Sequence, residues 1–302
     1  MLRYERLAAT GYPILIFGAS GVGKTEIAKE VHRLSPRKDR RLVVRGCGTF
    51  QSSTFAASIF GHRKGAFTDA KSDEPGLLRA TDGGTLVLDD IDALSLDSQA
   101  ALLSFLDTGL VTPLGDNARE RQVDVRLIAT TNKDLENEVE RGVFREDLLY
   151  RIGEFIIDVP PLSEAKSRIK PLIAEFEREL LDDPKTSLTD RKLSEKLVRL
   201  LHLHDWPGNI RELRSVVRNL LMFCDENDSV AINLDEAITI LESPECRRLP
   251  FLRAMRSRAA SDPELVHSIL DLVNWNKMLA ARITGLSRPT IYNLIDRNKW
   301  NE

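Results

Sequence analysis

GASGVGKT, residues 18–25, stands between two stretches of contrasting pattern. The preceding run PILIFG (13–18) is apolar and β-rich, and the following run KTEIAKEVHRL (24–34) has the spacing of a helix. A strand, a glycine-rich turn and a helix in this order form the context that a phosphate-binding loop of the pattern G-x-x-x-x-G-K-[ST] requires. A chance glycine-rich turn is the alternative, and the matching flanks on both sides argue against it.

The chemistry of this loop follows from its residue types. Gly21 and Gly23 let backbone N–H groups turn inward around phosphates, and Lys24 reaches the β- and γ-oxygens of a nucleoside triphosphate. The Thr25 hydroxyl can bind Mg²⁺, so ATP and Mg²⁺ are the expected cofactors. The predicted cofactor-binding residues in the loop are Gly18, Ala19, Ser20, Gly21, Val22, Gly23, Lys24 and Thr25.

LVLDD, residues 86–90, is a second apolar strand that ends in carboxylates. It predicts Asp89 beside the metal ion, together with Thr25, and Asp90 where a carboxylate polarises a water for attack on the γ-phosphate. Taken alone, an acidic pair at a strand end more often caps a helix. The phosphate loop in the same chain favours the catalytic interpretation.

Composition limits the classes of protein that fit. The chain has 302 residues, 42% of them hydrophobic, which suffices for two or three domains with cores of their own. A net charge of -3 argues against general binding to polyanions. Residues 244–302, however, carry ten Lys and Arg against six Asp and Glu, a local excess that indicates a nucleic-acid contact near the C-terminus.

Cysteine usage and hydropathy point to a reducing, aqueous compartment. Cys47, Cys224 and Cys246 are far apart and form no CxxC pair, which argues against a disulfide framework and a zinc site. No run approaches the roughly 18 apolar residues that span a bilayer, and the N-terminus lacks the apolar centre of a signal peptide. We therefore expect a cytoplasmic protein without a membrane partner.

Short β-rich runs alternate with helical stretches from residue 13 to residue 131, which predicts an α/β fold with a mostly parallel sheet covered on both faces. After EFIIDVPPL (154–162) the pattern becomes wholly helical. An arginine-rich stretch with Pro at both ends indicates a linker that can hold a short helix. The predicted domains are an α/β nucleotide-binding subdomain (1–162), a helical lid (163–243), the linker (244–263) and an all-α helix-turn-helix domain (264–302).

Further motifs accompany the phosphate loop in a fixed order. They are IFGHRKGAFTDA (59–70), PGLLRATDGGTLVLDDID (75–92), VDVRLIATTN (123–132), FREDLLYR (144–151) and WPGNIREL (206–213). With these motifs, residues 12–225 resemble the AAA+ ATPase activators of the bacterial sigma-54 form of RNA polymerase. The resemblance implies an AAA+ P-loop NTPase with a parallel sheet and a helical lid subdomain, assembled as a ring that we expect to be a hexamer.

The resemblance gives GAFTDA the role of a surface-loop tip that projects from the ATPase ring and grips the sigma factor. Phe67 would contact that partner, and Thr68 would support the contact. A lone aromatic is a weak interface signal, and from these residues alone the simpler interpretation is that Phe67 folds back onto its own domain. The predicted partner-binding residues are Gly65, Ala66, Phe67, Thr68, Asp69 and Ala70.

Several catalytic roles are likewise implied by position in the motifs. Thr131 and Asn132 match the sensor of the γ-phosphate, and Arg211 matches the lid arginine that senses the nucleotide. Arg145 and Arg151 match arginines that reach the neighbouring subunit's nucleotide, so one chain would not complete its own active site. A polar strand end and a solvated helix face with i, i+4 pairs are the alternatives. The predicted catalytic residues are Lys24, Asp89, Asp90, Thr131, Asn132, Arg145 and Arg151.

Some positions depart from the family pattern. Asp90 stands where most relatives have the longer Glu, which implies slower hydrolysis because displacements of about 1 Å matter in catalysis. Gly46 stands where relatives commonly carry an Asn that holds the catalytic carboxylate. Asp69 replaces the second glycine of the loop motif and adds a negative charge at the proposed contact. About a dozen residues precede the first strand, too few for a sensory domain or for the usual helix over the adenine.

NKMLAARITGLSRPTIYNLIDRNK, residues 276–299, has two helical stretches around a turn at Gly285. Ala281 lies four residues before Gly285, as a close helix crossing and a tight turn require. The segment resembles the Fis-like helix-turn-helix that ends many of these activators, and a helical hairpin for oligomerisation is the alternative. Ser287 would cap the second helix, whose first residues could face the major groove. The predicted DNA-binding residues are Arg288, Thr290, Tyr292, Asn293 and Arg297.

Together these features predict a ring-forming ATPase that binds an upstream DNA element and remodels sigma-54 RNA polymerase, with hydrolysis driving the movement of the surface loop. The alternatives are a DNA-associated regulator or scaffold that binds nucleotide with weak or no hydrolysis, and an AAA+ remodeller of a different partner. Phosphate release in the presence of DNA distinguishes the scaffold from the motor, and binding to sigma-54 distinguishes the two remodellers.

Overall fold

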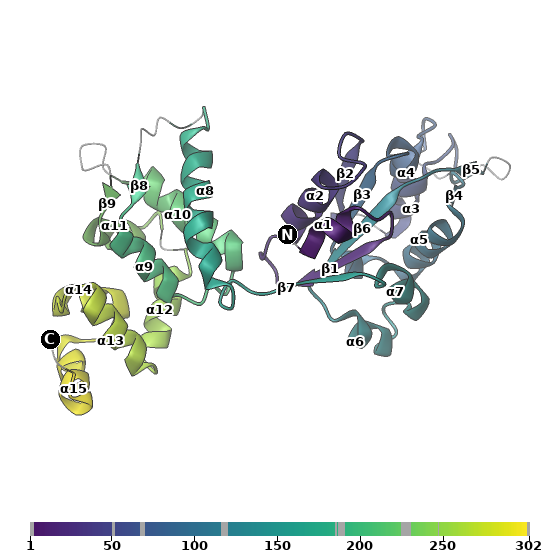
Figure 1. Cartoon of the computed structure of the whole chain (residues 1–302). Coiled ribbons are helices and arrows are strands. Elements are labelled where there is room, and N and C mark those ends of the chain that lie inside the picture. Colours follow the sequence, from purple (N-terminus) through teal and green to yellow (C-terminus); the bar gives the residue numbers. More distant parts are fainter. Residues whose placement is uncertain are drawn as a thin grey trace. The chain divides into compact units, whose positions relative to one another are not determined.

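The computed structural model divides into two compact units, residues 1–159 and residues 160–302 (Figure 1). It describes residues 3–49, 52–66, 70–115, 120–184, 186, 191–224, 231–246 and 248–300. The first unit is an α/β domain, and the second is mainly helical. In the part of the chain that the structure describes, no helix is long and apolar enough to cross a lipid bilayer.

A parallel sheet forms the centre of the first unit. Within the described residues it has five strands, in the order β2 (Leu42–Gly46), β3 (Thr85–Asp89), β6 (Arg126–Thr131), β1 (Ile14–Gly18) and β7 (Ile156–Val159). The apolar runs of β1, β3 and β6 are buried because helices cover both faces, as an all-parallel sheet requires. The prediction of an α/β fold with a parallel sheet is therefore confirmed.

Each face of the sheet has its own hydrophobic core, since side chains alternate along a strand. Val87 and Ile128 belong to the core that is covered by α1 (Arg3–Ala8) and α2 (Lys24–Arg33). Leu88 and Ala129 belong to the other core. The helices that contribute to this second core include α3 (Ser52–Phe60), α4 (Gly76–Ala80), α5 (Leu96–Thr108), α6 (Leu135–Glu140) and α7 (Glu146–Ile152). The shorter elements are the 3₁₀ turns η1 (Cys47–Thr49) and η2 (Ile91–Ala93) and the antiparallel pair β4 (Leu110–Val111) and β5 (Arg121–Gln122).

A short helix, α1, precedes the first strand. This helix, α1, buries Ala8 in the core. Arg126, only 1% exposed, donates hydrogen bonds to the carbonyl oxygens of Leu7 (2.6 Å) and Ala8 (2.8 Å) where α1 ends. A cation there satisfies the last carbonyls and opposes the helix dipole. Burial lowers the pKa of Arg126 to about 10, which leaves it charged at neutral pH.

The second unit is built around one continuous core. Its helices are α8 (Ile169–Leu181), α9 (Glu195–Leu203), α10 (Asn209–Met222), α11 (Leu234–Glu242), α12 (Phe251–Ala259), α13 (Pro263–Leu272), α14 (Lys277–Thr284) and α15 (Arg288–Asn298). The turn η3 (Lys166–Arg168) and the parallel pair β8 (Lys192–Leu193) and β9 (Ala231–Ile232) accompany them, and this pair departs from the wholly helical pattern expected. Among the described residues, a cluster of buried hydrophobic side chains continues from Leu162 to Ile291. The predicted linker contributes α12 to this core.

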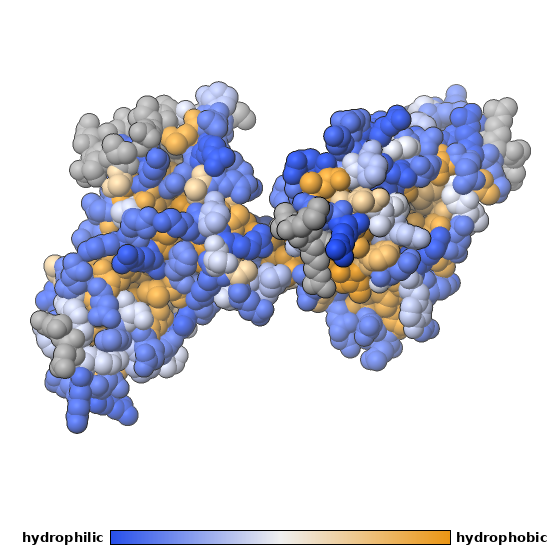
Figure 2. All heavy atoms as spheres, viewed as in Figure 1, coloured by the Kyte–Doolittle hydropathy of each residue, from blue (hydrophilic) through white to orange (hydrophobic). Residues whose placement is uncertain are grey.

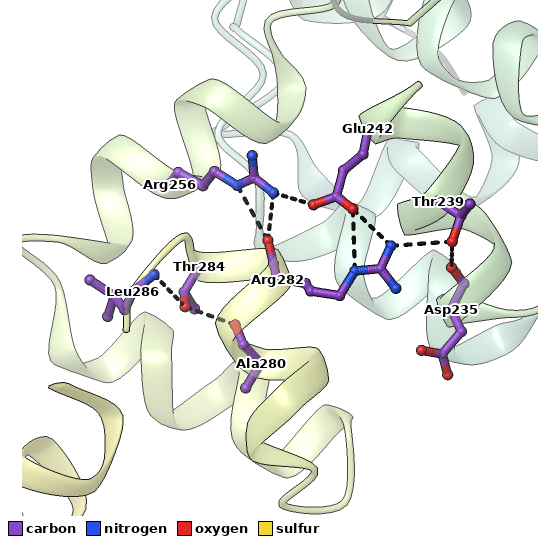
Figure 3. Close-up of polar contacts among 8 residues, drawn as sticks. All are labelled: Asp235, Thr239, Glu242, Arg256, Ala280, Arg282, Thr284 and Leu286. Carbon is purple, nitrogen blue, oxygen red and sulfur yellow. Dashed lines mark hydrogen bonds and ion pairs between the residues drawn. The ribbon is translucent and has the colours of Figure 1, made fainter. Parts of the chain in front are cut away.

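Glu242 links several helices of the second unit (Figure 3). Its carboxylate, at the end of α11, accepts hydrogen bonds from Arg256 of α12 (2.6 Å) and Arg282 of α14 (2.7 Å). Arg256 also donates to the backbone oxygen of Arg282 (2.7 Å). We call these three residues the Glu242 clasp. Burial alone would raise the pKa of Glu242, but the hydrogen bonds from Arg282 and Arg256 outweigh burial and hold this pKa below its ordinary value.

Glu242→Gln should lower the free energy of unfolding of the second unit by about 1–2 kcal/mol at pH 7, because two arginines lose a shared, partly exposed carboxylate. Because the pKa of Glu242 is lower in the folded state than its ordinary value of 4.5, the charge of Glu242 stabilises the fold fully at pH values above 4.5. This contribution is lost as the pH falls through the pKa of Glu242 in the folded state. The difference between the variant and the parent should therefore shrink in acid. Urea unfolding followed by tryptophan fluorescence measures it, since Trp206, Trp275 and Trp300 all belong to this unit.

Glu195→Gln is the matched control for the clasp. Glu195 forms an ion pair with Lys170 at 2.8 Å, and both side chains are more than half exposed. Such a pair contributes little to stability, so the control should unfold at nearly the same urea concentration as the parent. Equal losses in the two variants would contradict a special role for the clasp.

Candidate functional site

The phosphate loop lies at the carboxyl edge of the sheet, between β1 and α2. Gly21 and Gly23 have φ angles of 80° and 93°, in the left-handed region that residues with a side chain rarely adopt. Gly23 is also the N-cap of α2, and glycine has no side chain that could accept a hydrogen bond from the first N–H groups of the helix. The backbone is thus suited to binding an anion at the start of α2.

Lys24 is folded into the loop that it follows. Its side chain is buried, with the residue 8% exposed, and Nζ donates hydrogen bonds to the carbonyl oxygens of Gly18 (2.9 Å) and Ala19 (3.2 Å). A buried ammonium requires such partners, since an unpaired charge is costly to remove from water. The carbonyl groups therefore hold a positive charge where the phosphates of a nucleotide are predicted to bind.

Asp89, at the end of β3, meets the start of α2. Thr25 Oγ1 donates a hydrogen bond to Asp89 Oδ1 at 3.2 Å, although the two residues are 64 positions apart in the sequence. Hydroxyl and carboxylate oxygens are ligands that Mg²⁺ prefers. Thr25 and Asp89 therefore fit the predicted metal ion, which would offset the negative charge of the phosphates.

Asp90 follows at the same edge with a left-handed backbone, φ 54° and ψ 59°. Aspartate tolerates this region better than most residues. The alternative interpretation made Asp90 a helix cap, but its side chain makes no capping hydrogen bond to η2. Asp90 is exposed, so a water molecule can reach its carboxylate. Burial, followed by the charges of Asp89, Asp90 and Asp92, raises the pKa of Cys47 to about 12, so this nearby thiol stays protonated.

Thr130 is a residue of this edge that the sequence did not single out. Its hydroxyl donates a hydrogen bond to Asp89 Oδ1 (2.5 Å) and accepts one from the backbone N–H of Asp90 (3.2 Å). The motif IATTN offers two adjacent threonines, and strand alternation places them on opposite faces. Which of them faces Asp89 depends on the pairing of β6 with β3, and no local pattern shows that pairing.

Thr131 and Asn132, the predicted sensor of the γ-phosphate, lie at and just beyond the end of β6. Thr131 is buried, and its hydroxyl donates to Asp92 Oδ1 at 2.7 Å. Asp92 also pairs with Lys133 at 3.1 Å, and this hydrogen bond raises the pKa of Lys133. Asn132 is exposed. The Thr131 hydroxyl thus donates its proton to Asp92, next to the predicted catalytic carboxylates.

Arg151 lies at the opposite edge of the sheet from the phosphate loop. It lines a hollow of about 520 Å³ together with Pro13, which precedes β1, and Val125, which precedes β6. The first and last residues of a five-residue strand such as β1 are about 13 Å apart, at about 3.3 Å per residue. The phosphate loop of its own chain is therefore out of reach of this side chain.

Both predicted trans-acting arginines are paired within the chain, but not at i, i+4. Arg145 makes hydrogen bonds of 3.0 and 2.7 Å with Asp147, which raise the pKa of Arg145. Arg151 pairs with Asp107 of α5 at 3.2 Å and donates to the backbone oxygen of Leu106 at 2.8 Å. Exposed pairs of this kind contribute little to stability, so an arginine can exchange its carboxylate for a phosphate at low cost.

The predicted tip of the partner-binding loop, Phe67, Thr68 and Asp69, lies outside the described residues. The flanking residues form a closed base, in which the N–H of Gly65 donates to the carbonyl oxygen of Ala70 at 2.9 Å. Ala70 is buried, and Ala66 is half-buried. The N–H of Lys64 donates to Asp73 at 2.8 Å and is the first cause of the lowered pKa of Asp73. The residues on the two sides of the predicted tip are therefore joined directly to each other.

Arg211 lies in the first turn of α10, directly after the WPGN turn. Glu212, buried in the same turn, accepts a hydrogen bond from the N–H of Gly208 at 2.8 Å. Trp206, 1% exposed, donates its indole N–H to the carbonyl oxygen of Leu201 at 3.0 Å. These contacts fix the start of α10, on which Arg211 is exposed.

The helices α14 and α15 meet at a tight turn. Gly285 ends α14 with a φ of 70°, and Ser287 caps α15 by accepting a hydrogen bond from the N–H of Thr290 at 3.3 Å. Ile291 is buried, so one face of α15 packs into the second unit. The predicted DNA-binding residues, all of them exposed, are Arg288, Thr290, Tyr292, Asn293 and Arg297.

Comparison with known families accounts for both units up to residue 244. Residues 1–158 match the family described as the Sigma-54 interaction domain, and residues 164–244 match the AAA+ ATPase lid domain. The chain therefore belongs to the sigma-54 interaction domain family of AAA+ proteins. The prediction of an AAA+ domain with a helical lid is confirmed by these matches.

Individual relatives are similar over nearly the whole chain. The Nif-specific regulatory protein of Azotobacter vinelandii is 36% identical over 289 residues, which cover 94% of this chain and 53% of that protein. The hydrogenase transcriptional regulatory protein HoxA of Bradyrhizobium diazoefficiens is 35% identical, over 98% of this chain and 56% of that protein. The chain thus spans about half the length of these curated relatives.

Solved structures of NtrX from Brucella abortus are also similar. The complex with ADP has a TM-score of 0.69 and 25% identity, and the match covers 98% of this chain and 67% of that chain. The complex with ATP has a TM-score of 0.66 and 26% identity, over 97% and 65% of the two chains.

Proposed function

We propose that this chain is the ATP-hydrolysing part of a transcription activator that remodels the sigma-54 form of RNA polymerase and binds an upstream DNA element. The observation that carries the proposal is the carboxyl edge of the sheet, where Lys24, Thr25 and Asp89 converge from α2 and β3. Membership of the sigma-54 interaction domain family supports the choice of partner. A cytoplasmic location follows, because RNA polymerase works there.

The residues at this edge divide the work of ATP hydrolysis. Lys24 and the N–H groups of the loop bind and orient the triphosphate. Thr25 and Asp89 would hold Mg²⁺, which supplies charge neutralisation when bound. Asp90 accepts a hydrogen bond from a water molecule and directs its oxygen to the γ-phosphorus. The new O–P bond forms as the bond to the β–γ bridging oxygen breaks, and ADP leaves together with inorganic phosphate, which carries the two protons of the water molecule.

A ring of copies is proposed from the position of Arg151. Its side chain lies about one strand length from its own phosphate loop, so its guanidinium is available to the nucleotide of a neighbour. A planar, permanently charged guanidinium stabilises the charge on the transferred phosphoryl group. Arg145, at the start of the same helix, is proposed to act with it. We propose a closed ring, a hexamer, in which each chain completes the site of the next.

The loop at residues 65–70 is proposed to carry the effect of hydrolysis to the sigma factor. The hydrogen bond between Gly65 and Ala70 closes its base, and Asp73 ties that base to the domain. A movement of the ATPase domain is therefore transmitted to the loop as a whole. Phe67 is the proposed contact, because an aromatic side chain makes an effective interface anchor.

DNA binding is proposed for α15. Arg288, Asn293 and Arg297 supply the guanidinium and amide groups that read base edges and bind phosphates. Figure 2 shows hydrophilic residues over the exposed part of α15, as such a surface requires. The Glu242 clasp fixes α14 to α11, so the proposed DNA-reading helices are attached to the lid.

In vitro transcription from a sigma-54 promoter tests this function. Phe67→Ala should lower ATP-dependent activation by about tenfold or more, as the loss of an aromatic anchor predicts, and it should leave phosphate release unchanged. The two results together would separate contact with the partner from chemistry on the nucleotide.

Phe223→Ala is the matched control, because Phe223 is 49% exposed in the lid. It should change neither activation nor phosphate release. Full activation by Phe67→Ala would refute the role of the loop. A parent chain that hydrolyses ATP without activating transcription would indicate a different partner, and one that binds nucleotide without releasing phosphate would indicate the scaffold.

A further inference from the structure

We propose that Thr130 is a positioning residue for ATP hydrolysis, whose hydroxyl fixes the Asp89 carboxylate and the backbone of Asp90 in one arrangement. This role rests on the proposed ATPase function. Thr130 is fully buried and acts through its two neighbours. It joins the predicted metal ligand to the predicted water-polarising residue.

The register of the sheet brings Asp89 and Thr130 level with each other. β3 and β6 are neighbours, and Leu88 is paired with Ala129, one position before. The preceding pair, Val87 and Ile128, lies in the core beneath α2. Because side chains alternate along a strand, residues two positions later, Asp89 and Thr130, point to that same face. Thr25 reaches the same carboxylate from α2. The contact therefore follows from the strand order and not from local sequence.

The hydroxyl of Thr130 uses both of its hydrogen-bonding roles. It donates its proton to Asp89 Oδ1 at 2.5 Å, and it accepts the N–H of Asp90 at 3.2 Å. A hydrogen bond to an ionised carboxylate is about twice as strong as a neutral one. Because threonine is β-branched, its χ1 rotation is restricted and the hydroxyl keeps a defined direction.

The other strand beside Asp89 supplies no side chain. Gly46 of β2 is paired with Asp89 in the register of the sheet. Asp89 Oδ1 is instead held by the hydroxyls of Thr25 and Thr130. Thr25 is a predicted metal ligand, so Thr130 is the hydroxyl that can hold the carboxylate in either state of Thr25.

Asp90 depends on the same contact. Its φ of 54° is disfavoured for a residue with a side chain. The hydrogen bond from its N–H to Thr130 Oγ1 fixes the peptide plane from which the carboxylate projects. Without this bond, Asp90 can relax and carry its carboxylate away from the water molecule. A displacement of about 1 Å costs about a hundredfold in rate.

Thr130→Val tests the role, because valine keeps the shape of threonine and lacks the hydroxyl. The kcat for phosphate release should fall by about ten- to a hundredfold, while the Kd for nucleotide without Mg²⁺ should not change. If Mg²⁺ is added, nucleotide should bind more tightly, and the Mg²⁺ concentration at the midpoint of this effect should rise by about tenfold in the variant. The reason is that Asp89, the predicted metal ligand, is held less well. Thr130→Ser should restore most of both properties.

Thr85→Val is the matched control on the same face of the sheet. Thr85 is equally buried, and its hydroxyl contacts His32 Nδ1 at 2.9 Å at the other end of β3. This variant should leave the Mg²⁺ dependence and kcat unchanged. If valine at position 130 prevents folding, Thr130→Ser is compared with Thr130→Ala, and equal behaviour of those two overturns the proposal.

A failed ATPase and a failed positioning role give different results. A parent chain without phosphate release refutes the ATPase proposal, and the Mg²⁺ titration of nucleotide binding still tests Thr130. A parent chain that hydrolyses ATP, with Thr130→Val equal to it in kcat and in Mg²⁺ dependence, refutes the positioning role alone.

Discussion

Lys24→Ala should lower phosphate release by about a hundred- to a thousandfold and weaken nucleotide binding, because it removes a preorganised positive charge from the phosphate loop. The carbonyl groups of Gly18 and Ala19 hold the ammonium in place. Alanine leaves only the backbone N–H groups of the loop to bind the phosphates. Titration with a fluorescent ATP analogue and a phosphate-release assay measure the two effects separately.

Lys29→Ala is the control on the same helix. Lys29 pairs with Glu26 at 2.8 Å on the exposed side of α2. A surface pair of this kind contributes about 0–1 kcal/mol, so the variant should bind and hydrolyse ATP as the parent does. If Lys24→Ala released phosphate at the parent rate, the triphosphate would have to bind elsewhere on the chain.

The phosphate loop was predictable because every part of it is a local pattern. Glycine spacing, the apolar strand before it and the helix after it all lie within residues 13–34. The contact between Thr25 and Asp89 required one further inference, that parallel strands end at a common edge where ligands bind. That inference depends on strand direction alone and not on strand order.

Contacts that depend on strand order or on distant packing were not predictable in the same way. Thr130 meets Asp89 only because β6 lies beside β3. Arg126 caps a helix that ends 118 residues earlier in the chain, and Arg151 selects Asp107 of another helix as its partner. Local spacing describes each of these residues correctly as polar and strand- or helix-forming. Local spacing does not show which distant residue tertiary packing will bring into contact with each of them.

The apolar contacts of the C-terminal helices were likewise not predictable from local sequence patterns. Phe251 of the predicted linker packs with its ring 5.5 Å from that of Trp206, and the core continues to Ile291. An amphipathic helix must bury its apolar face, but its periodicity does not say which neighbour covers it. The Glu242 clasp adds a polar connection between the lid and α14 that no motif marks.

Arg151→Ala should lower the kcat for ATP hydrolysis by about a thousandfold or more, with little change in nucleotide affinity, as expected for an arginine that acts from a neighbouring subunit. Its guanidinium lies at the amino edge of the sheet and pairs with Asp107 at 3.2 Å. Because that pair is exposed, its loss should cost less than about 1 kcal/mol of stability. Arg33→Ala, which removes an exposed pair with Glu30, is the control and should retain full activity.

Mixing two inactive variants separates a role between subunits from a role within one chain. The Lys24→Ala chain keeps Arg151, and the Arg151→Ala chain keeps an intact phosphate loop. In a head-to-tail ring, about a quarter of the interfaces in an equal mixture join an intact loop to an intact arginine, so phosphate release should recover to about a quarter of the parent level. Activity that stayed at the level of the separate variants would mean that Arg151 acts within its own chain. The proposed ring would then have no catalytic basis, since the distance across the sheet would no longer require a second copy.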